Sequence, residues 1–174
     1  MRMPEGGTQE PAPAEGGEVG PAPALLDYSV EPHTVECSGR NGPERAVSLT
    51  VHAFNAGAEP VRCRLISIQM PLGEGQTALT DRPWLIWPAP GRSTPWHVSV
   101  AGEGRWECAL LPPQVDIPPG RRASFEFSHV VVNTTPDKNG ARLTIREHHG
   151  SESAPVYLFV KKLPSSSQAA AEPA

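Results

Sequence analysis

The sequence predicts an all-β fold, a single antiparallel β-sandwich of immunoglobulin-like type with seven to nine strands. Apolar residues recur at every second position, as expected for strands that bury one face. Turn-forming residues separate these runs. The 21 prolines also limit the longest Pro-free stretches of residues 25–163 to 16–18 residues. Long helices have little room, and short strands joined by turns are typical of a sandwich.

The clearest segment is residues 46–70, AVSLTVHAFNAGAEPVRCRLISIQM. It predicts two strands that form a hairpin through the polar turn at residues 55–60. The apolar positions change phase at Leu65 and Ile66. We interpret this change as a β-bulge, although a strand that crosses from one sheet to the other would give the same pattern.

The remaining strands follow the same spacing. A first strand is expected at 25–30, extended past Pro32 by residues 33–36, and a second hairpin pairs 96–100 with 106–110 around the turn 101–104. A turn at 115–120 precedes a strand at 123–132. The loop 133–140, in which Asn139-Gly140 forms a turn, leads to strands at 141–145 and 156–161.

Composition divides the chain into a central domain and two tails. Residues 1–24 are rich in Pro and Gly without any aromatic residue, and residues 164–174 offer no large side chain to bury, so both are expected to be disordered. The sandwich domain is predicted at residues 25–163, which contain every Trp, Tyr and Phe.

Charge and leader signals exclude several classes of function. Residues 25–163 carry 14 Lys and Arg against 14 Asp and Glu, so the formal charge of −4 belongs to the tails. A neutral domain lacks the basic surface of a nucleic-acid or membrane-surface binder. No apolar leader or membrane-spanning run is visible, and three cysteines fit a reduced compartment, which together predict a cytoplasmic protein.

Two segments resemble a known kind of module. LTVHAFNAGAEPVRC is similar to the hairpin "strand, Asn-x-Gly, Pro-Val, strand" of bacterial immunoglobulin-like and fibronectin-like domains, and IPPGRRASFEF is similar to their turn-and-strand element. The resemblance covers about a quarter of residues 25–163. It implies a generic β-sandwich module and no specific family.

The candidate binding segment is residues 82–96, RPWLIWPAPGRSTPW, with three of the four tryptophans. Proline stiffens such a segment and indoles offer large contact areas, which suits recognition of a protein, peptide or sugar. The candidate partner-binding residues are Trp84, Leu85, Trp87 and Arg92. The competing interpretation, which we favour from the sequence, is that Trp84, Leu85 and Trp87 plug an open end of the sandwich.

No other pattern predicts a catalytic, cofactor or metal site. His148 and His149 should point to opposite faces of a strand and so should not chelate one ion. We expect Cys63 and Cys108 to be separate buried thiols and Cys37 to be exposed. Gly73–Thr77 lacks the Lys and the helix of a phosphate loop, and Asn133-Thr134-Thr135 is only a formal glycosylation acceptor.

These observations predict a non-enzymatic module that binds another protein as an accessory or structural part of a larger assembly, through loops or edge strands. Edge strands would also allow homo-oligomers. The alternative is a carbohydrate-binding module with Trp84 and Trp87 as a stacking platform. An enzyme is third, and would need His33, His129, His148 or His149 to meet carboxylates in space.

Overall fold

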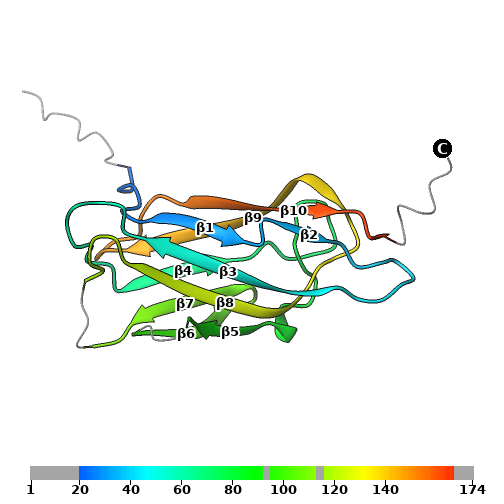
Figure 1. The fold of residues 1–174 in the computed structure, drawn as a ribbon, viewed down its shortest axis with the longest axis horizontal. Coiled ribbons are helices and arrows are strands. Elements are labelled where there is room, and N and C mark those ends of the chain that lie inside the picture. Colours follow the sequence, from blue (N-terminus) through cyan, green and yellow to red (C-terminus); the bar gives the residue numbers. More distant parts are fainter. Residues whose placement is uncertain (1–19, 92–94, 113–115, 167–174) are drawn as a thin grey trace, which may run out of the picture.

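The computed structural model describes residues 20–91, 95–112 and 116–166, which form two packed sheets (Figure 1). The four-stranded sheet has the order β1 (Asp27–Glu31), β3 (Ala46–Phe54), β8 (Arg122–Val131) and β5 (Trp87–Pro90). The six-stranded sheet has the order β2 (Thr34–Glu36), β10 (Val156–Leu163), β9 (Asp137–His148), β4 (Leu65–Gln69), β7 (Arg105–Leu110) and β6 (Trp96–Gly102).

The predicted all-β sandwich is confirmed. All strand pairs are antiparallel except β2 with β10. The ten described strands exceed the predicted seven to nine because β2 and β5 are short strands in proline-containing segments. The part of the chain that the structure describes contains no helix long and apolar enough to cross a membrane.

The predicted hairpin of residues 46–70 is wrong. β3 pairs with β1 and β8, whereas β4 pairs with β7 and β9 in the other sheet. The turn leads across the sandwich because Val61 bridges to Ile117 rather than back to β3. β4 begins only at Leu65, so the bulge assigned to Leu65 and Ile66 is also wrong, and the chain changes sheet before the strand.

The first predicted strand is likewise divided between the sheets. β1 pairs with β3, while β2 runs parallel to β10 in the six-stranded sheet. The Glu31–Pro32 peptide bond, which is cis, lies between them. Residues 33–36 therefore do not extend the first strand.

The second predicted hairpin is confirmed, since β6 and β7 pair antiparallel around the turn that contains Gly104. Asn139-Gly140, in contrast, is not a turn but lies inside β9. Gly140 has φ +87°, and a Cβ there would lie 2.8 Å from the Val160 carbonyl oxygen. This close approach explains the glycine at the irregular pairing of β9 with β10.

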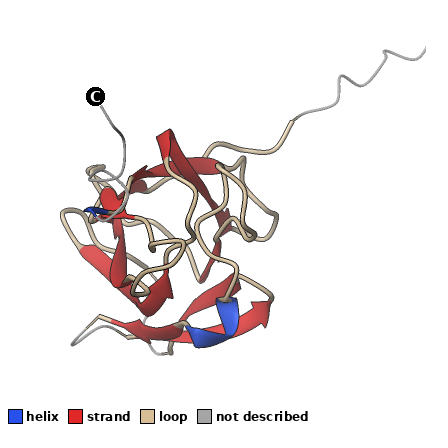
Figure 2. Cartoon of the chain, turned by 90° about the vertical axis from the view of Figure 1, so that its right-hand side faces the viewer, coloured by secondary structure: helices blue, strands red, loops and turns tan. Residues whose placement is uncertain are grey.

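Inward-facing side chains of both sheets form the core. Figure 2 shows the strands that surround it, seen from one end of the molecule. Trp96 of β6 packs edge-on against Phe125 of β8, with ring centroids 5.4 Å apart. Trp106 of β7 lies 5.0 Å from Phe127. These aromatic pairs join the two sheets near β5 and β6, so Trp96, the third tryptophan of the candidate binding segment, is a core residue.

The two segments that carried the sequence resemblance meet at one end of the sandwich. The buried Asn55 side chain accepts a hydrogen bond from the Gly57 amide and donates to the carbonyls of Glu59 and Ile117. The Gly120 amide in turn donates to the Asn55 carbonyl. Asn55 therefore links the turn after β3 to the turn before β8.

A second buried amide holds the loop between β4 and η1 (Pro83–Leu85). Asn133 donates through Nδ2 to the carbonyls of Gly73, Gly75 and Ala78, and its Oδ1 accepts from the Lys162 ammonium at 2.9 Å. Lys162 also donates to the Ala78 carbonyl and is 1% exposed. The carbonyls of this loop therefore point into the protein. Because Asn133 is only 4% exposed, the folded chain does not present it as a glycosylation acceptor.

All three cysteines are buried and free. The prediction of separate thiols at Cys63 and Cys108 is therefore confirmed. The prediction that Cys37 is exposed is wrong, because Cys37 is 0% exposed. Its amide donates to the carbonyl of Leu163, the last residue of β10.

Residues 1–19 and 167–174, most of both predicted tails, lie outside the described residues. Two described residues just beyond the predicted domain limits also bond to the sandwich. The Ala22 carbonyl accepts from the Ala154 amide, and the Ser166 amide donates to Glu36. The division at residues 24 and 164 stays a prediction.

Burial of Cys108 makes stability depend on pH. Burial raises the pKa of this thiol above its ordinary 9.0. Above pH 9 the unfolded chain releases a proton that the folded chain keeps, so the free energy of unfolding falls as pH rises. We expect Cys108→Ala to remove about 1.4 kcal/mol of this fall per pH unit above 9. Urea unfolding at increasing pH measures it, and equal slopes in both proteins would contradict it.

Candidate functional site

The predicted recognition segment is exposed at two of its tryptophans. Trp84, in η1, is 73% exposed, and Trp87, at the start of β5, is 70% exposed. Ile86 between them is buried and Leu85 is partly buried. The plug interpretation therefore fails for both indoles, and Ile86 takes the inward position. Arg92 lies outside the described residues.

Trp84 forms one wall of a small hollow of about 260 Å³. The other walls include Pro83, Ile86 and Val100, and Trp106 lies at its base within the core. Val100, on β6, is 70% exposed. Glu103 is the one charged residue among the described residues around this hollow. We call Trp84, Trp87 and Val100 the tryptophan surface.

The tryptophan surface lies where the edge strands of the two sheets meet. β5 is the last strand of one sheet and β6 the last strand of the other, and they lie side by side at the lower edge of Figure 1. β5 contains Pro88 and Pro90, which have no amide proton to offer an added strand. β5 therefore offers side chains rather than a full ladder of amides for binding.

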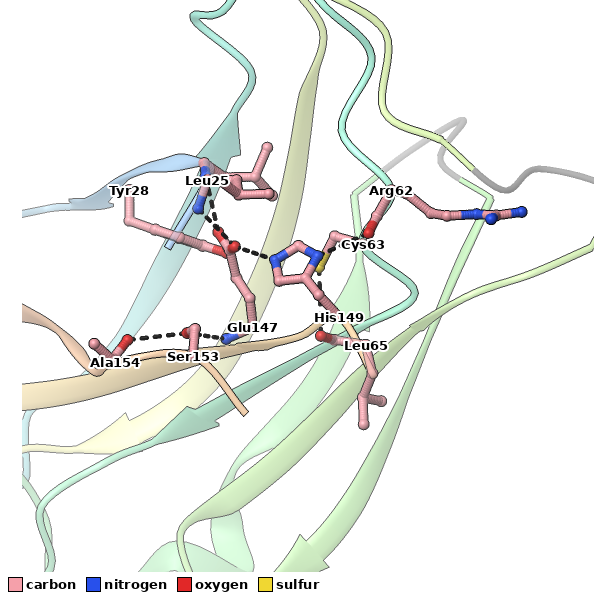
Figure 3. Close-up of polar contacts among 10 residues, drawn as sticks. Leu25, Tyr28, Arg62, Cys63, Leu65, Glu147, His149, Ser153 and Ala154 are labelled. Carbon is pink, nitrogen blue, oxygen red and sulfur yellow. Dashed lines mark hydrogen bonds and ion pairs between the residues drawn. The ribbon is translucent and has the colours of Figure 1, made fainter. Parts of the chain in front are cut away.

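A second site, which the sequence did not predict, is built around the buried Glu147 near the C-terminal end of β9 (Figure 3). Its carboxylate accepts three hydrogen bonds and lies against a histidine ring. The amides of Leu25 and Leu26 donate at 2.7 and 2.9 Å, the Tyr28 hydroxyl at 2.9 Å, and Nε2 of His149 lies 2.5 Å from Oε2. Burial and this carboxylate raise the pKa of Tyr28, which keeps its hydroxyl a donor.

The same cluster holds three groups of metal-ligating type. Sγ of Cys63, a carboxylate oxygen of Glu147 and a ring nitrogen of His149 lie within 4.8 Å of one another. Burial, with a contribution from Glu147, raises the pKa of Cys63 to about 12, so the thiol keeps its proton at neutral pH in the absence of a cation. Nδ1 of His149 lies 2.7 Å from the Arg62 carbonyl oxygen, on the other side of the ring.

A wide hollow of about 960 Å³ opens on the outer side of this cluster. His149 lines it and is part of the cluster, with 21% of its side chain exposed. The turn 57–62 and His148 form other parts of the wall. The ring of His149 therefore stands between the hollow and the buried Glu147.

Only one of the four histidines considered for catalysis contacts a carboxylate within the described residues. His148 turns away from His149 and bonds to the Ser67 hydroxyl at 2.6 Å, in agreement with the expected opposite faces. Glu147 and His149 lie two residues apart and so share a face, a signal that was present in the sequence. Cys63 comes from a distant segment, and no local pattern indicates that it joins them.

Comparisons with known proteins identify no family. No protein-family model matches the chain, and no curated protein matches it. Similar solved structures include the seventh ScaB type I cohesin of Pseudobacteroides cellulosolvens, with 10% identity, a TM-score of 0.47, and coverage of 82% of this chain and 94% of that one.

Two further similar structures have different functions. The sixth cohesin of scaffoldin B of Acetivibrio cellulolyticus, solved with a Cel5 dockerin, has 8% identity and a TM-score of 0.41 and covers 82% of this chain and 96% of its own. AvmM, which catalyses a macrocyclization in alchivemycin A biosynthesis, has 11% identity and a TM-score of 0.39 over 82% and 92%. Likenesses at this level carry no argument about function.

Proposed function

We propose that this chain is a non-enzymatic module that binds another protein through the tryptophan surface. The observation that carries the proposal is the exposure of Trp84 and Trp87, at 73% and 70%, in a sandwich whose other tryptophans are buried. Tryptophan is among the residues that most often dominate the binding energy of protein interfaces. Indoles are large and lose little conformational entropy on binding.

The walls of the hollow favour a protein over a sugar as the partner. A carbohydrate needs polar groups beside the stacking ring to replace the water bound to its hydroxyls, because unpaired polar groups are costly to bury. Trp84 instead faces Pro83, Ile86 and Val100, and Glu103 supplies the charge at the rim. An apolar side chain of a protein partner, with a basic residue near Glu103, suits this surface.

The first test is the double variant Trp84→Ala/Trp87→Ala. We expect the wild-type chain to recover a specific partner in a pulldown and to bind that purified partner in calorimetry. The double variant should bind it about 100-fold or more weakly, because interface tryptophans often contribute 2 kcal/mol or more each. Both indoles are exposed, so the thermal unfolding temperature should stay close to that of the wild type.

The matched control is Tyr157→Ala/Phe159→Ala, which removes two aromatic rings from the outer face of β10, where they are 44% and 50% exposed. This control should keep full affinity. Equal affinity of the purified partner for all three proteins would refute the proposal. A shift of tryptophan fluorescence with polysaccharides, lost in the tryptophan double variant, would favour the carbohydrate-binding alternative instead.

A further inference from the structure

We propose that Cys63, Glu147 and His149 form a binding site for one divalent cation of the zinc class. The proposal goes beyond the proposed protein-binding function and does not depend on it, because the cluster lies at the C-terminal end of β9 and shares no residue with the tryptophan surface. Three observations support it: the count of protons around His149, the types of the three donor atoms, and the access from the outer hollow.

The count of protons shows that a positive species belongs between His149 and Glu147. Nδ1 of His149 lies 2.7 Å from the Arg62 carbonyl, which can only accept, so Nδ1 carries the ring proton. Nε2 then turns its lone pair toward Oε2 of Glu147 at 2.5 Å. Two lone pairs at this distance repel unless a proton or a metal ion lies between them. A backbone carbonyl that fixes the opposite nitrogen is also the usual support of a metal-bound histidine.

The donor atoms select a borderline cation over calcium or magnesium. Sulfur, imidazole nitrogen and one carboxylate oxygen suit zinc, whereas calcium and magnesium prefer oxygen donors alone. The amide of Leu25 already occupies one side of Oε2 and leaves the side toward His149 for the cation. Zinc bonds of about 2.0–2.3 Å require Nε2 and Oε2 to separate by about 1 Å.

The position of the ring permits that movement and provides access. His149 follows the last residue of β9, and its side chain is partly exposed on the wall of the outer hollow. Cys63 and Glu147 are fully buried behind it. A cation would enter from the hollow, displace the thiol proton of Cys63 and keep a coordination position for water on the hollow side.

The test is a titration of the full, tag-free chain with Co²⁺, followed by competition with Zn²⁺. We expect one ion per chain and the ultraviolet absorption of a thiolate-bound cobalt ion, which Zn²⁺ displaces. Cys63→Ala should abolish this absorption. His149→Ala should weaken binding at least about 10-fold, because loss of even a supporting contact to a metal ligand has effects of this size.

The matched control is Cys108→Ala, which removes another fully buried thiol that is not part of the cluster. Folded Cys108→Ala should bind cobalt as the wild type does, and His148→Ala should also keep the thiolate absorption. Absence of the absorption from the wild type, or its persistence in Cys63→Ala, would overturn the proposal. So would a nitrogen NMR spectrum that shows the His149 ring doubly protonated and unchanged by excess Zn²⁺, since the positive species would then be a proton.

Discussion

Glu147→Ala is expected to lower the free energy of unfolding by about 3–5 kcal/mol, measured by urea unfolding in the presence of a chelator. The carboxylate accepts hydrogen bonds from two backbone amides and a tyrosine hydroxyl, and it contacts the His149 ring. Its removal leaves these donors without their acceptor at a position that is fully buried. The chelator limits the measurement to contacts within the protein.

The loss should appear first where the chain enters the sandwich. Glu147 belongs to the six-stranded sheet, while Leu25 and Leu26 precede β1 of the four-stranded sheet, so this side chain ties the two sheets together. Hydrogen exchange at the amides of Leu25 and Leu26 should therefore accelerate in Glu147→Ala more than at the centre of β8. Glu147→Gln should have an intermediate effect, because its amide keeps one acceptor oxygen but turns a donor toward other donors.

Glu107→Ala is the matched control. Glu107 lies on the neighbouring strand β7, its side chain is 36% exposed, and it forms an ion pair with Arg105 at 3.6 Å. Exposed pairs of this kind contribute about 0–1 kcal/mol. If Glu147→Ala were no more destabilising than Glu107→Ala, the buried carboxylate would not be the link between the sheets that its contacts indicate.

The sequence predicted features that depend on neighbouring residues and missed those that depend on distant partners. The β6–β7 hairpin was predicted correctly because its turn joins strands that pair directly. The turn after β3 has the same chemistry, but Asn55 bonds to Ile117, about 60 residues away, and the chain crosses to the other sheet. No local pattern distinguishes the two cases.

The sites divide in the same way. Composition indicated the segment that contains Trp84 and Trp87. Whether its indoles are exposed depends on whether Ile86 or an indole points into the core, and the pairing of β5 with β8 determines this. The Glu147 and His149 spacing was visible as a shared strand face. Their meeting with Cys63 depends on the pairing of β4 with β9, which places Leu65 opposite His148. Register between strands so far apart is a property of the whole fold.

Asn133→Ala is expected to cost about 3 kcal/mol of unfolding free energy, because it removes the donor for three carbonyls and one acceptor of a buried ammonium. Each of these groups then loses a hydrogen-bond partner at a position that water hardly reaches, since Asn133 itself is 4% exposed. Asn133→Asp tests the role of the donor, since it keeps the acceptor for Lys162 but turns a carboxylate toward the carbonyls. It should be destabilising as well, although its attraction to the Lys162 ammonium offsets part of the loss.

The exposed Asn139 of β9 is the control, and Asn139→Ala should change stability by no more than about 0.5 kcal/mol. Lys162→Met completes the comparison. It breaks the hydrogen bond from the Lys162 ammonium to Asn133 Oδ1 at 2.9 Å, which Asn133→Ala breaks as well, so the double variant should cost less than the sum of the two single variants. Full additivity would show that the two side chains act separately. A coupling of about 0.5 kcal/mol or more would show that Asn133 and Lys162 hold the 73–78 loop together as one network across β10 and the segment after β8.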